Sequence, residues 1–104
     1  MAATEDKASG LFAEEDEQRE AERIREREQK DFENALASVM ATTYGRKVIF
    51  RILALTGVNG SVTSTDPMAM MARSARRDVG LELLDQLKRA RLDEALLRME
   101  KENK

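Results

Sequence analysis

Residues 43–57, which read TYGRKVIFRILALTG, carry the clearest helix signal in the chain. Thr43 belongs to the residue types that cap helix N-termini, and Gly57 is suited to the left-handed conformation that ends many helices. The β-branched pair Val48-Ile49 would also suit the start of a strand, but strands usually run for only roughly four to eight residues. We therefore predict a helix over 44–56. Its wide apolar stripe suits a central element and comprises Val48, Ile49, Ile52, Leu53 and Leu55.

A long helix is predicted before this segment, from about residue 12 to residue 40. The stretch contains no Gly or Pro and is rich in strong helix formers. Between residues 14 and 30 only Ala21 and Ile24 are apolar, so this part cannot pack a face against a core. We expect it to stand in solvent or to become ordered on a partner.

The domain organisation follows from where the apolar pattern begins. A core-facing stripe at helical spacing starts with Phe32, Leu36, Val39 and Met40. Residues 1–11 are mostly small and polar and are expected to be disordered. We therefore predict that residues 1–31 form a disordered start and a charged, solvent-exposed helix, and that residues 32–104 form a small helical domain.

Two further helices are predicted after Gly57. Asn59-Gly60 indicates a turn, and Asp66-Pro67 pairs a capping acid with a proline at the first helical position, so a third helix should run from 67 to about 90. Gly80 lies inside it, where a close helix–helix contact would explain a glycine. Asp93 is expected to cap a last helix over 94–103. The main stripe of the third helix comprises Met68, Ala72, Ala75, Val79, Leu83 and Leu87, widened by Met71, Leu84 and Ala90. The fold class is therefore all-α, a long charged helix running into a bundle of three further helices.

Composition argues against an enzyme. The 104 residues include no cysteine and no histidine, which excludes disulfides, Cys/His zinc sites and Ser-His or Cys-His nucleophile pairs within one chain. No phosphate-binding loop motif is present, and the carboxylates lie in charge-alternating helix without a pocket to shift their pKa. We expect no catalytic residue, no bound metal and no cofactor. We also expect neither a membrane span nor a signal peptide.

Charge divides the chain into two parts. Residues 1–34 carry twelve acidic and six basic side chains, whereas residues 35–104 carry eight acidic and twelve basic ones. One interpretation is a solvated helix joined to a core with a basic face, and the other is that the two parts have different partners. Oligomeric state stays open, because apolar heptads are not sustained before Phe32.

The candidate contact residues are Arg73, Arg76 and Arg77, which share a helical face. They can neutralise phosphates or an acidic protein surface, or they can be solvated and paired with nearby carboxylates such as Asp78 and Glu82. A methionine cluster at the start of the same helix is interpreted as core, with an adaptable binding surface as the alternative. This methionine cluster comprises Met68, Met70 and Met71. The aromatic residues Tyr44 and Phe50 are also expected to pack in the core, with the anchoring of a partner as the alternative.

Two segments in order resemble a family of small tailed-phage proteins first named in a Bordetella phage. The segments are Tyr44-Gly45-Arg46-Lys47-Val48-Ile49-Phe50-Arg51-Ile52-Leu53 with Thr56-Gly57-Val58, and Ala75-Arg76-Arg77-Asp78-Val79-Gly80-Leu81 with Leu97-Arg98-Met99-Glu100. The motif positions are Gly45, Arg46, Arg76, Arg77 and Gly80. Ser74-Ala75 departs from the pattern, since the family often has a glycine before the arginine pair.

The resemblance implies a virion component without enzymatic activity. We accordingly expect a bacteriophage structural or assembly protein that docks by its helices to other phage structural proteins in the head–tail or internal part of the virion. It would be found in the virion, and in the host cytoplasm during assembly. Gly45 is expected to permit a tight turn, Gly80 a close helix crossing, and Arg46 with Arg76 or Arg77 to pair with carboxylates at the core rim. The alternative is a small DNA-binding or regulatory protein that uses the arginine face.

Overall fold

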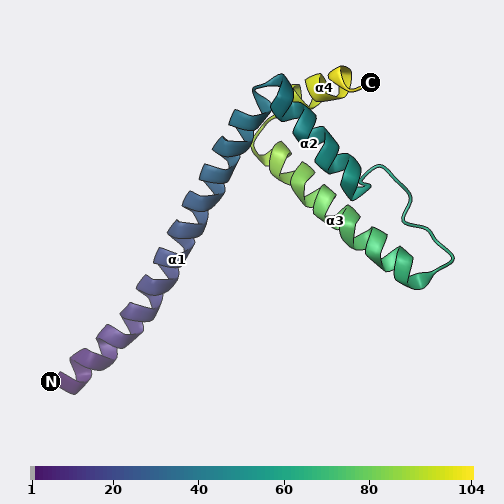
Figure 1. Ribbon diagram of the computed structural model, residues 1–104. Coiled ribbons are helices and arrows are strands. Elements are labelled where there is room, and N and C mark those ends of the chain that lie inside the picture. Colours follow the sequence, from purple (N-terminus) through teal and green to yellow (C-terminus); the bar gives the residue numbers. More distant parts are fainter. Residues whose placement is uncertain (1) are drawn as a thin grey trace. The chain divides into compact units, whose positions relative to one another are not determined.

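The structure is a computed structural model that describes the backbone of residues 2–104 and the side chains of residues 12–104. Within these residues it contains four α-helices and no strand, which confirms the predicted all-α fold (Figure 1). The helices are α1 (Ala2–Met40), α2 (Thr43–Thr56), α3 (Pro67–Arg89) and α4 (Asp93–Glu102). No helix of the described part is long and apolar enough to cross a membrane.

The chain separates into two compact units, residues 1–32 and residues 33–104. We call the described side chains of the first unit, residues 12–32, the arm, and residues 33–104 the helical domain. The arm lies wholly in α1, and the domain contains the last turns of α1 together with α2, α3 and α4. α1 begins at Ala2 and not near residue 12 as predicted. The expected disorder at the start of the chain stays a prediction. Ala, Glu, Lys and Leu in this stretch favour helix, and they outweigh a single glycine.

The N-terminus of α2 is capped by Thr42 and not by Thr43 as predicted. Thr42 has extended backbone angles (φ −114°, ψ 152°), and its hydroxyl accepts a hydrogen bond of 3.0 Å from the Gly45 amide. Adjacent threonines offer the same capping chemistry, so the sequence does not distinguish them. At the other end, Gly57 has φ 67° and its amide donates to the Ala54 carbonyl at 3.1 Å, which confirms the predicted glycine C-cap.

The start of α3 is the predicted one: Asp66 accepts a hydrogen bond of 3.0 Å from the Met68 amide, and Pro67 occupies the first helical position. Asp93, predicted as the cap of the last helix, is instead the first residue of α4. Leu92 holds the cap position and makes no side-chain capping hydrogen bond. Asp93 still favours the helix start, because its charge lies at the positive end of the helix dipole.

Between α3 and α4 the chain turns through Arg91, which has φ 59°. The Arg91 amide donates to the Lys88 carbonyl (3.0 Å) and the Leu92 amide to the Leu87 carbonyl (3.2 Å). This pair of bonds defines a Schellman motif, in which a residue in the left-handed conformation satisfies the last carbonyls of a helix. An arginine thus stands where glycine is usual, and Leu92 is placed to pack on the core.

The core lies entirely in the helical domain. Its buried side chains come from all four helices and from the α2–α3 loop: Leu36, Met40, Ile49, Leu53, Val58, Leu87 and Met99. Leu36, Met40 and Leu87 confirm their predicted stripes. Phe32 and Val39 were predicted to face the core as well, but they are 44% and 39% exposed. The reason is that α1 presents only its Leu36–Met40 face to the other helices of the domain.

Two glycines mark close approaches. Gly80 is buried, and a Cβ there would lie 2.8 Å from the Thr56 Cβ and 3.2 Å from the Val58 Cβ, so the predicted close contact of α3 with the end of α2 is confirmed. A Cβ at Gly45 would collide with the carbonyl oxygen of Val39. Gly45 therefore serves the tight passage from α1 to α2, as the sequence predicted.

Candidate functional site

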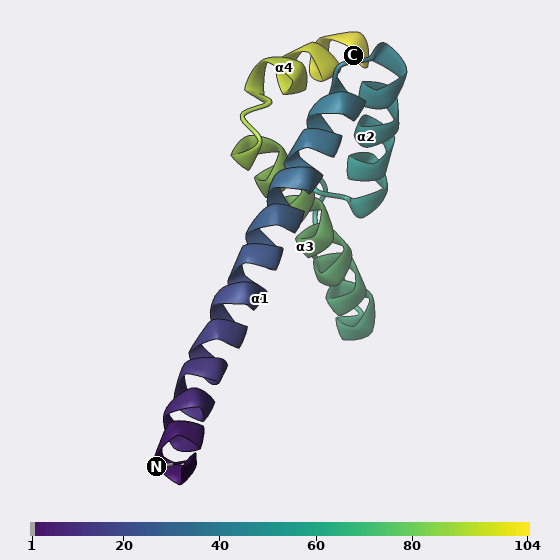
Figure 2. The same ribbon diagram turned by 90° about the vertical axis from the view of Figure 1, so that its left-hand side faces the viewer.

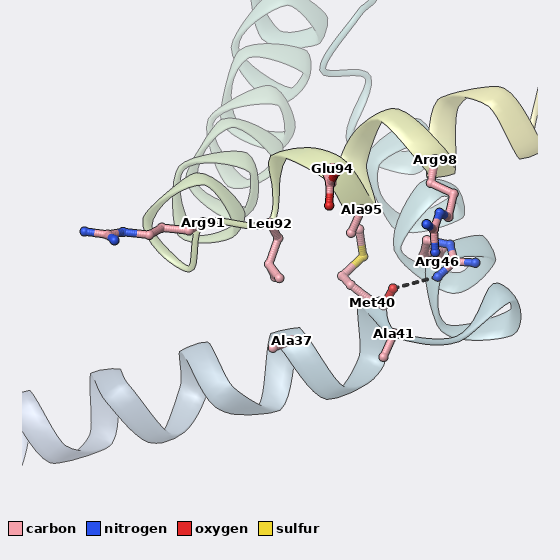
Figure 3. Close-up of a pocket in the computed structure, with 9 residues that line it drawn as sticks. All are labelled: Ala37, Met40, Ala41, Arg46, Arg91, Leu92, Glu94, Ala95 and Arg98. Atoms are coloured by element: carbon pink, nitrogen blue, oxygen red, sulfur yellow. Dashed lines mark hydrogen bonds between the residues drawn. The ribbon is translucent and has the colours of Figure 1, made fainter.

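Arg46 is the one buried charged side chain among the described residues, at 5% exposure. Its Nη2 lies 2.7 Å and its Nε 3.0 Å from the two carboxylate oxygens of Glu102, which extends from the end of α4. Its Nη1 donates to the Met40 carbonyl at 2.8 Å (Figure 3). Arg46 therefore joins the ends of α1, α2 and α4, and the expectation that it pairs with a carboxylate at the core rim is confirmed.

Hydrogen bonding between these two groups favours both charged forms. It lowers the pKa of Glu102 below the ordinary glutamate value and raises the pKa of Arg46, with partial burial acting in the opposite direction on each. The nearby Arg98 contributes to the shift at Glu102. Arg46 therefore has a structural role, because its positive charge is paired with the Glu102 carboxylate within the fold.

Next to this ion pair, a hollow of about 280 Å³ separates the end of α1 from α4 (Figure 3). The side chains that line it are Ala37, Met40, Ala41, Arg46, Arg91, Leu92, Glu94, Ala95 and Arg98. In Figure 3, Glu94 points from α4 toward Met40, whereas Arg91 points away from the other side chains drawn. The lining includes one carboxylate, that of Glu94, and the guanidiniums of Arg91 and Arg98 besides that of the ion-paired Arg46.

The predicted arginine face lies on α3, and two of its members hold the α2–α3 loop. Arg73 Nη1 donates to the Thr63 carbonyl at 3.1 Å, and Arg77 Nε donates to the Val58 carbonyl at 3.4 Å. Neither pairs with a carboxylate in the described part of the chain. The expectation that Arg76 or Arg77 pairs with a rim carboxylate finds no support, because Arg77 donates to the Val58 carbonyl instead and Arg76 makes no ion pair within the described residues.

Arg76 differs from its two neighbours. No hydrogen bond or ion pair within the described residues involves it. With Arg73 it borders a hollow of about 210 Å³ beside the α2–α3 loop, together with Leu55, Thr56, Gly57, Gly60, Ser61 and Val62. Of the three predicted contact residues, Arg76 therefore has the guanidinium least engaged by the fold. The assignment of all three to a phosphate or an acidic partner stays a prediction.

The methionine cluster is exposed, so its interpretation as core is wrong. Met68 and Met71 are 79% and 73% exposed, and Met70 is 37% exposed. Since α3 has 23 residues and α2 only 14, the first half of α3 extends beyond the end of α2 (Figures 1 and 2). The apolar stripe of α3 accordingly meets core only from about Gly80 onward, and Val79 is 63% exposed.

A second apolar surface, which the sequence did not single out, lies on the outer side of α2. Tyr44, Val48 and Leu55 are 82%, 56% and 69% exposed, and Ile52 is 40% exposed. We call these four side chains the outer face of α2. The prediction that Tyr44 packs in the core is wrong, whereas Phe50 does pack against the core. In the sequence, this outer face could have been recognised from the apolar stripe of α2, which is wider than one core-facing side of a helix requires.

No group of three or more acidic side chains in the described part of the chain is arranged to hold a metal ion. What the domain presents to its surroundings is apolar side chains on α2 and α3 with arginines beside them.

Comparison with known proteins identifies the family. Residues 36–101 match the Bbp19-like phage protein family, so the chain belongs to that family. The match begins at Leu36, where the core begins, and leaves the arm outside it. Neither a curated protein nor a solved structure matches the chain. The resemblance inferred from the Gly-Arg and Arg-Arg-x-Val-Gly-Leu segments is confirmed.

Proposed function

We propose that this phage protein is a non-enzymatic structural or assembly component, which docks by its helices to other virion proteins in the head–tail or internal part of the particle. It acts in the virion, and in the host cytoplasm during assembly. The observation that carries the proposal is the exposure of large apolar side chains on helices that are otherwise well capped and packed. Exposed apolar patches of this kind mark interaction surfaces.

The methionine cluster suits such docking particularly well. Met68 and Met71 are unbranched and polarizable, so they adapt to the shape of an opposing surface. They project from the half of α3 that no other helix of the domain covers. A partner that covers this half-helix would bury apolar surface without disturbing the core.

The first test is mass spectrometry of purified particles from the source phage, with a count of copies per particle. A fixed copy number supports a structural part, and a number that matches a ring or vertex symmetry would indicate its neighbours. Absence from finished particles, together with abundance in assembly intermediates, would narrow the proposal to an assembly factor. Absence from both would refute it.

A pair of variants tests the surface itself. Met71→Lys places a charge in the methionine cluster, whereas Ser38→Lys places the same charge on an exposed polar position of another helix, α1. We expect Met71→Lys to reduce incorporation into particles several-fold relative to Ser38→Lys, because a buried, unpaired ammonium opposes docking. Equal incorporation of the two variants would exclude the methionine cluster as the docking surface.

A DNA-binding or regulatory role is the second candidate, and the free guanidinium of Arg76 beside the loop hollow favours it. Binding through this face would weaken steeply with salt, because phosphate contacts release counterions. The discriminating variant is Arg76→Ala, since Arg73 and Arg77 also hold the loop. Loss of salt-dependent DNA affinity in Arg76→Ala would support this role. Unchanged binding after Arg73, Arg76 and Arg77 are all replaced by Ala would eliminate it.

A further inference from the structure

The outer face of α2 has the composition of a buried surface. On the inner side of α2, Ile49 and Leu53 are buried in the core, and on the opposite side the four apolar side chains of the outer face remain exposed. A helix that is apolar around most of its circumference is normally covered on both sides. Within the helical domain, α2 is covered on one side only.

The same side of α2 is also basic. Lys47 and Arg51 are exposed and lie one turn apart, and α2 contains no acidic residue. At 100° per residue, Tyr44, Val48 and Ile52 form one row and Lys47, Arg51 and Leu55 form the adjacent row. A groove on this side is lined by Lys47, Val48, Phe50, Arg51, Ile52 and Asn103. The surface therefore fits a helix that is apolar and acidic on one face.

The arm has such a face. Ile24, Glu28 and Phe32 lie one turn apart in a single row, and Ile24 and Phe32 are 43% and 44% exposed. Asp31 lies beside this row. Neither Glu28 nor Asp31 forms an ion pair in the structure; the ion pairs of the arm join Arg19 and Arg23 to Glu15, Asp16 and Glu20.

Most of the basic residues of the arm lie away from this face. The arm has nine acidic side chains and five basic ones. At helical spacing, four of the five basic residues fall in one stripe on another side of the helix, namely Arg19, Arg23, Arg27 and Lys30. The fifth, Arg25, lies near Glu28 and Phe32, so the face is only partly neutralised and stays net acidic.

We propose that the outer face of α2 binds the arm of a second copy of this chain. In this complex Ile24 and Phe32 cover the apolar row of α2, and Glu28 and Asp31 lie beside Lys47 and Arg51. An amphipathic helix laid into a groove with anchors one turn apart is a common mode of recognition. The proposal does not depend on the virion role, since it concerns only contacts between copies.

Charge complementarity argues for a second copy as the occupant. The α2 side carries Lys47 and Arg51 without an anion of its own helix, whereas the arm side carries Glu28 and Asp31 against one guanidinium, Arg25, and is net acidic. Opposite potentials on two parts of one chain favour association between copies over repulsion. Each copy offers one arm and one outer face, so a reciprocal exchange closes a dimer and a one-way exchange builds a ring or chain of copies.

The test measures the mass of the full-length protein in solution by light scattering after gel filtration, at about 0.1 M and about 1 M salt. We expect a dimer or a higher species at the lower salt and weaker association at the higher salt. A protein that is monomeric at both salts overturns the proposal, and this outcome would mean that a different protein covers the outer face or that the arm folds back within its own chain.

Charge reversal then locates the contact. Lys47→Glu/Arg51→Glu and Glu28→Lys/Asp31→Lys should each weaken self-association roughly tenfold or more, because each places like charges opposite each other. Combining the four substitutions should restore association. All four positions are exposed, so unchanged helicity by circular dichroism is expected for every variant.

The matched control is Lys88→Glu/Lys101→Glu, which changes the net charge as much on exposed positions of α3 and α4. It should associate like the unmodified chain. Association that resists Lys47→Glu/Arg51→Glu, or that fails to return in the combined variant, overturns the proposal. Loss of the protein from particles with self-association intact would instead count against the virion role alone.

Discussion

The arm and the helical domain are both helical, yet different forces hold them in that state. In the domain, seven apolar side chains are buried in one core, and the buried Arg46 is paired with the partly exposed carboxylate of Glu102. In the arm, Phe12, Ile24 and Phe32 are all more than 40% exposed. The arm is helical because of its strong helix formers and its ion pairs at helical spacing, which are local interactions.

The ion pairs of the arm contribute little to its stability. The three ion pairs of the arm have N–O distances of 3.6–3.9 Å, and their side chains are 59–73% exposed. Solvated pairs of this type typically contribute less than about 1 kcal/mol each. A charged helix without a buried face therefore gains most from a partner surface, which is consistent with an arm that docks on another copy.

The largest predicted effect separates a core residue from an arm residue. Leu87 is completely buried, so Leu87→Ala should lower the free energy of unfolding by about 2–5 kcal/mol through lost burial and a residual cavity. The matched truncation Ile24→Ala in the arm should change it by less than about 0.5 kcal/mol. Urea unfolding followed by circular dichroism, at high salt to suppress association, measures both. Equal effects would show that the arm belongs to the same cooperative unit.

A smaller effect is expected where α3 approaches the end of α2. Gly80→Ala forces its new Cβ against Thr56, so the free energy of unfolding should fall by about 1–3 kcal/mol. Gly60→Ala is the matched control, because a Cβ there meets only the Gly57 carbonyl oxygen at 3.5 Å. Thermal unfolding of the two variants compares them. A stabilised Gly80→Ala, as for an ordinary helical glycine, would mean that the helices separate there at little cost.

The ion pair of Arg46 predicts a pH dependence of the domain. The pKa of Glu102 is lower in the folded chain than its ordinary value of 4.5, so the unfolded chain binds the proton more readily. The stabilisation is therefore complete above about pH 4.5 and is lost as the pH falls through the folded pKa. Glu102→Gln should lower the melting temperature near neutral pH. It should also make the melting temperature less dependent on pH below about pH 4.5. If the melting temperatures of the unmodified chain and of Glu102→Gln fall in parallel as the pH is lowered, the Arg46–Glu102 pair is not the source of this pH dependence.

The smallest effect is expected from deleting the arm. A chain that starts at residue 32 should keep the melting temperature of the full-length protein within roughly 2 °C, because every core side chain lies at or beyond Leu36. The measurement is made at high salt, which weakens association between copies. A fall of more than several degrees would mean that the arm supports the fold of the domain, contrary to the predicted division at residues 31 and 32.

Much of the fold could be predicted because its signals are local. Asp66-Pro67 and Gly57 fix helix ends through chemistry that involves near neighbours only, and both were predicted. The choice between Thr42 and Thr43 as the N-cap of α2 could not be predicted, since both side chains carry the same hydroxyl group. Periodicity likewise places Met68 on an apolar stripe, but it contains no information on whether another helix is long enough to cover that stripe.

The candidate site was predicted less completely for the same reason. The sequence indicated that Arg46 would meet a carboxylate, but Glu102 lies 56 residues away and only the fold selects it. For Arg73 and Arg77 the partners are loop carbonyls, which any residue type supplies, so no sequence pattern marks them. The outer face of α2 was visible only as a stripe wider than one core needs.

The Arg46–Glu102 pair has a consequence for how α4 exchanges its amide hydrogens with solvent. α4 has ten residues and no side-chain cap, and such a helix would normally fray and exchange quickly. Detaching α4, however, exposes the buried Met99 and leaves the Arg46 guanidinium without its carboxylate inside the fold. Local opening is thereby coupled to disruption of the core. The amides of α4 should then exchange about as slowly as those around Leu87, by opening of the whole domain.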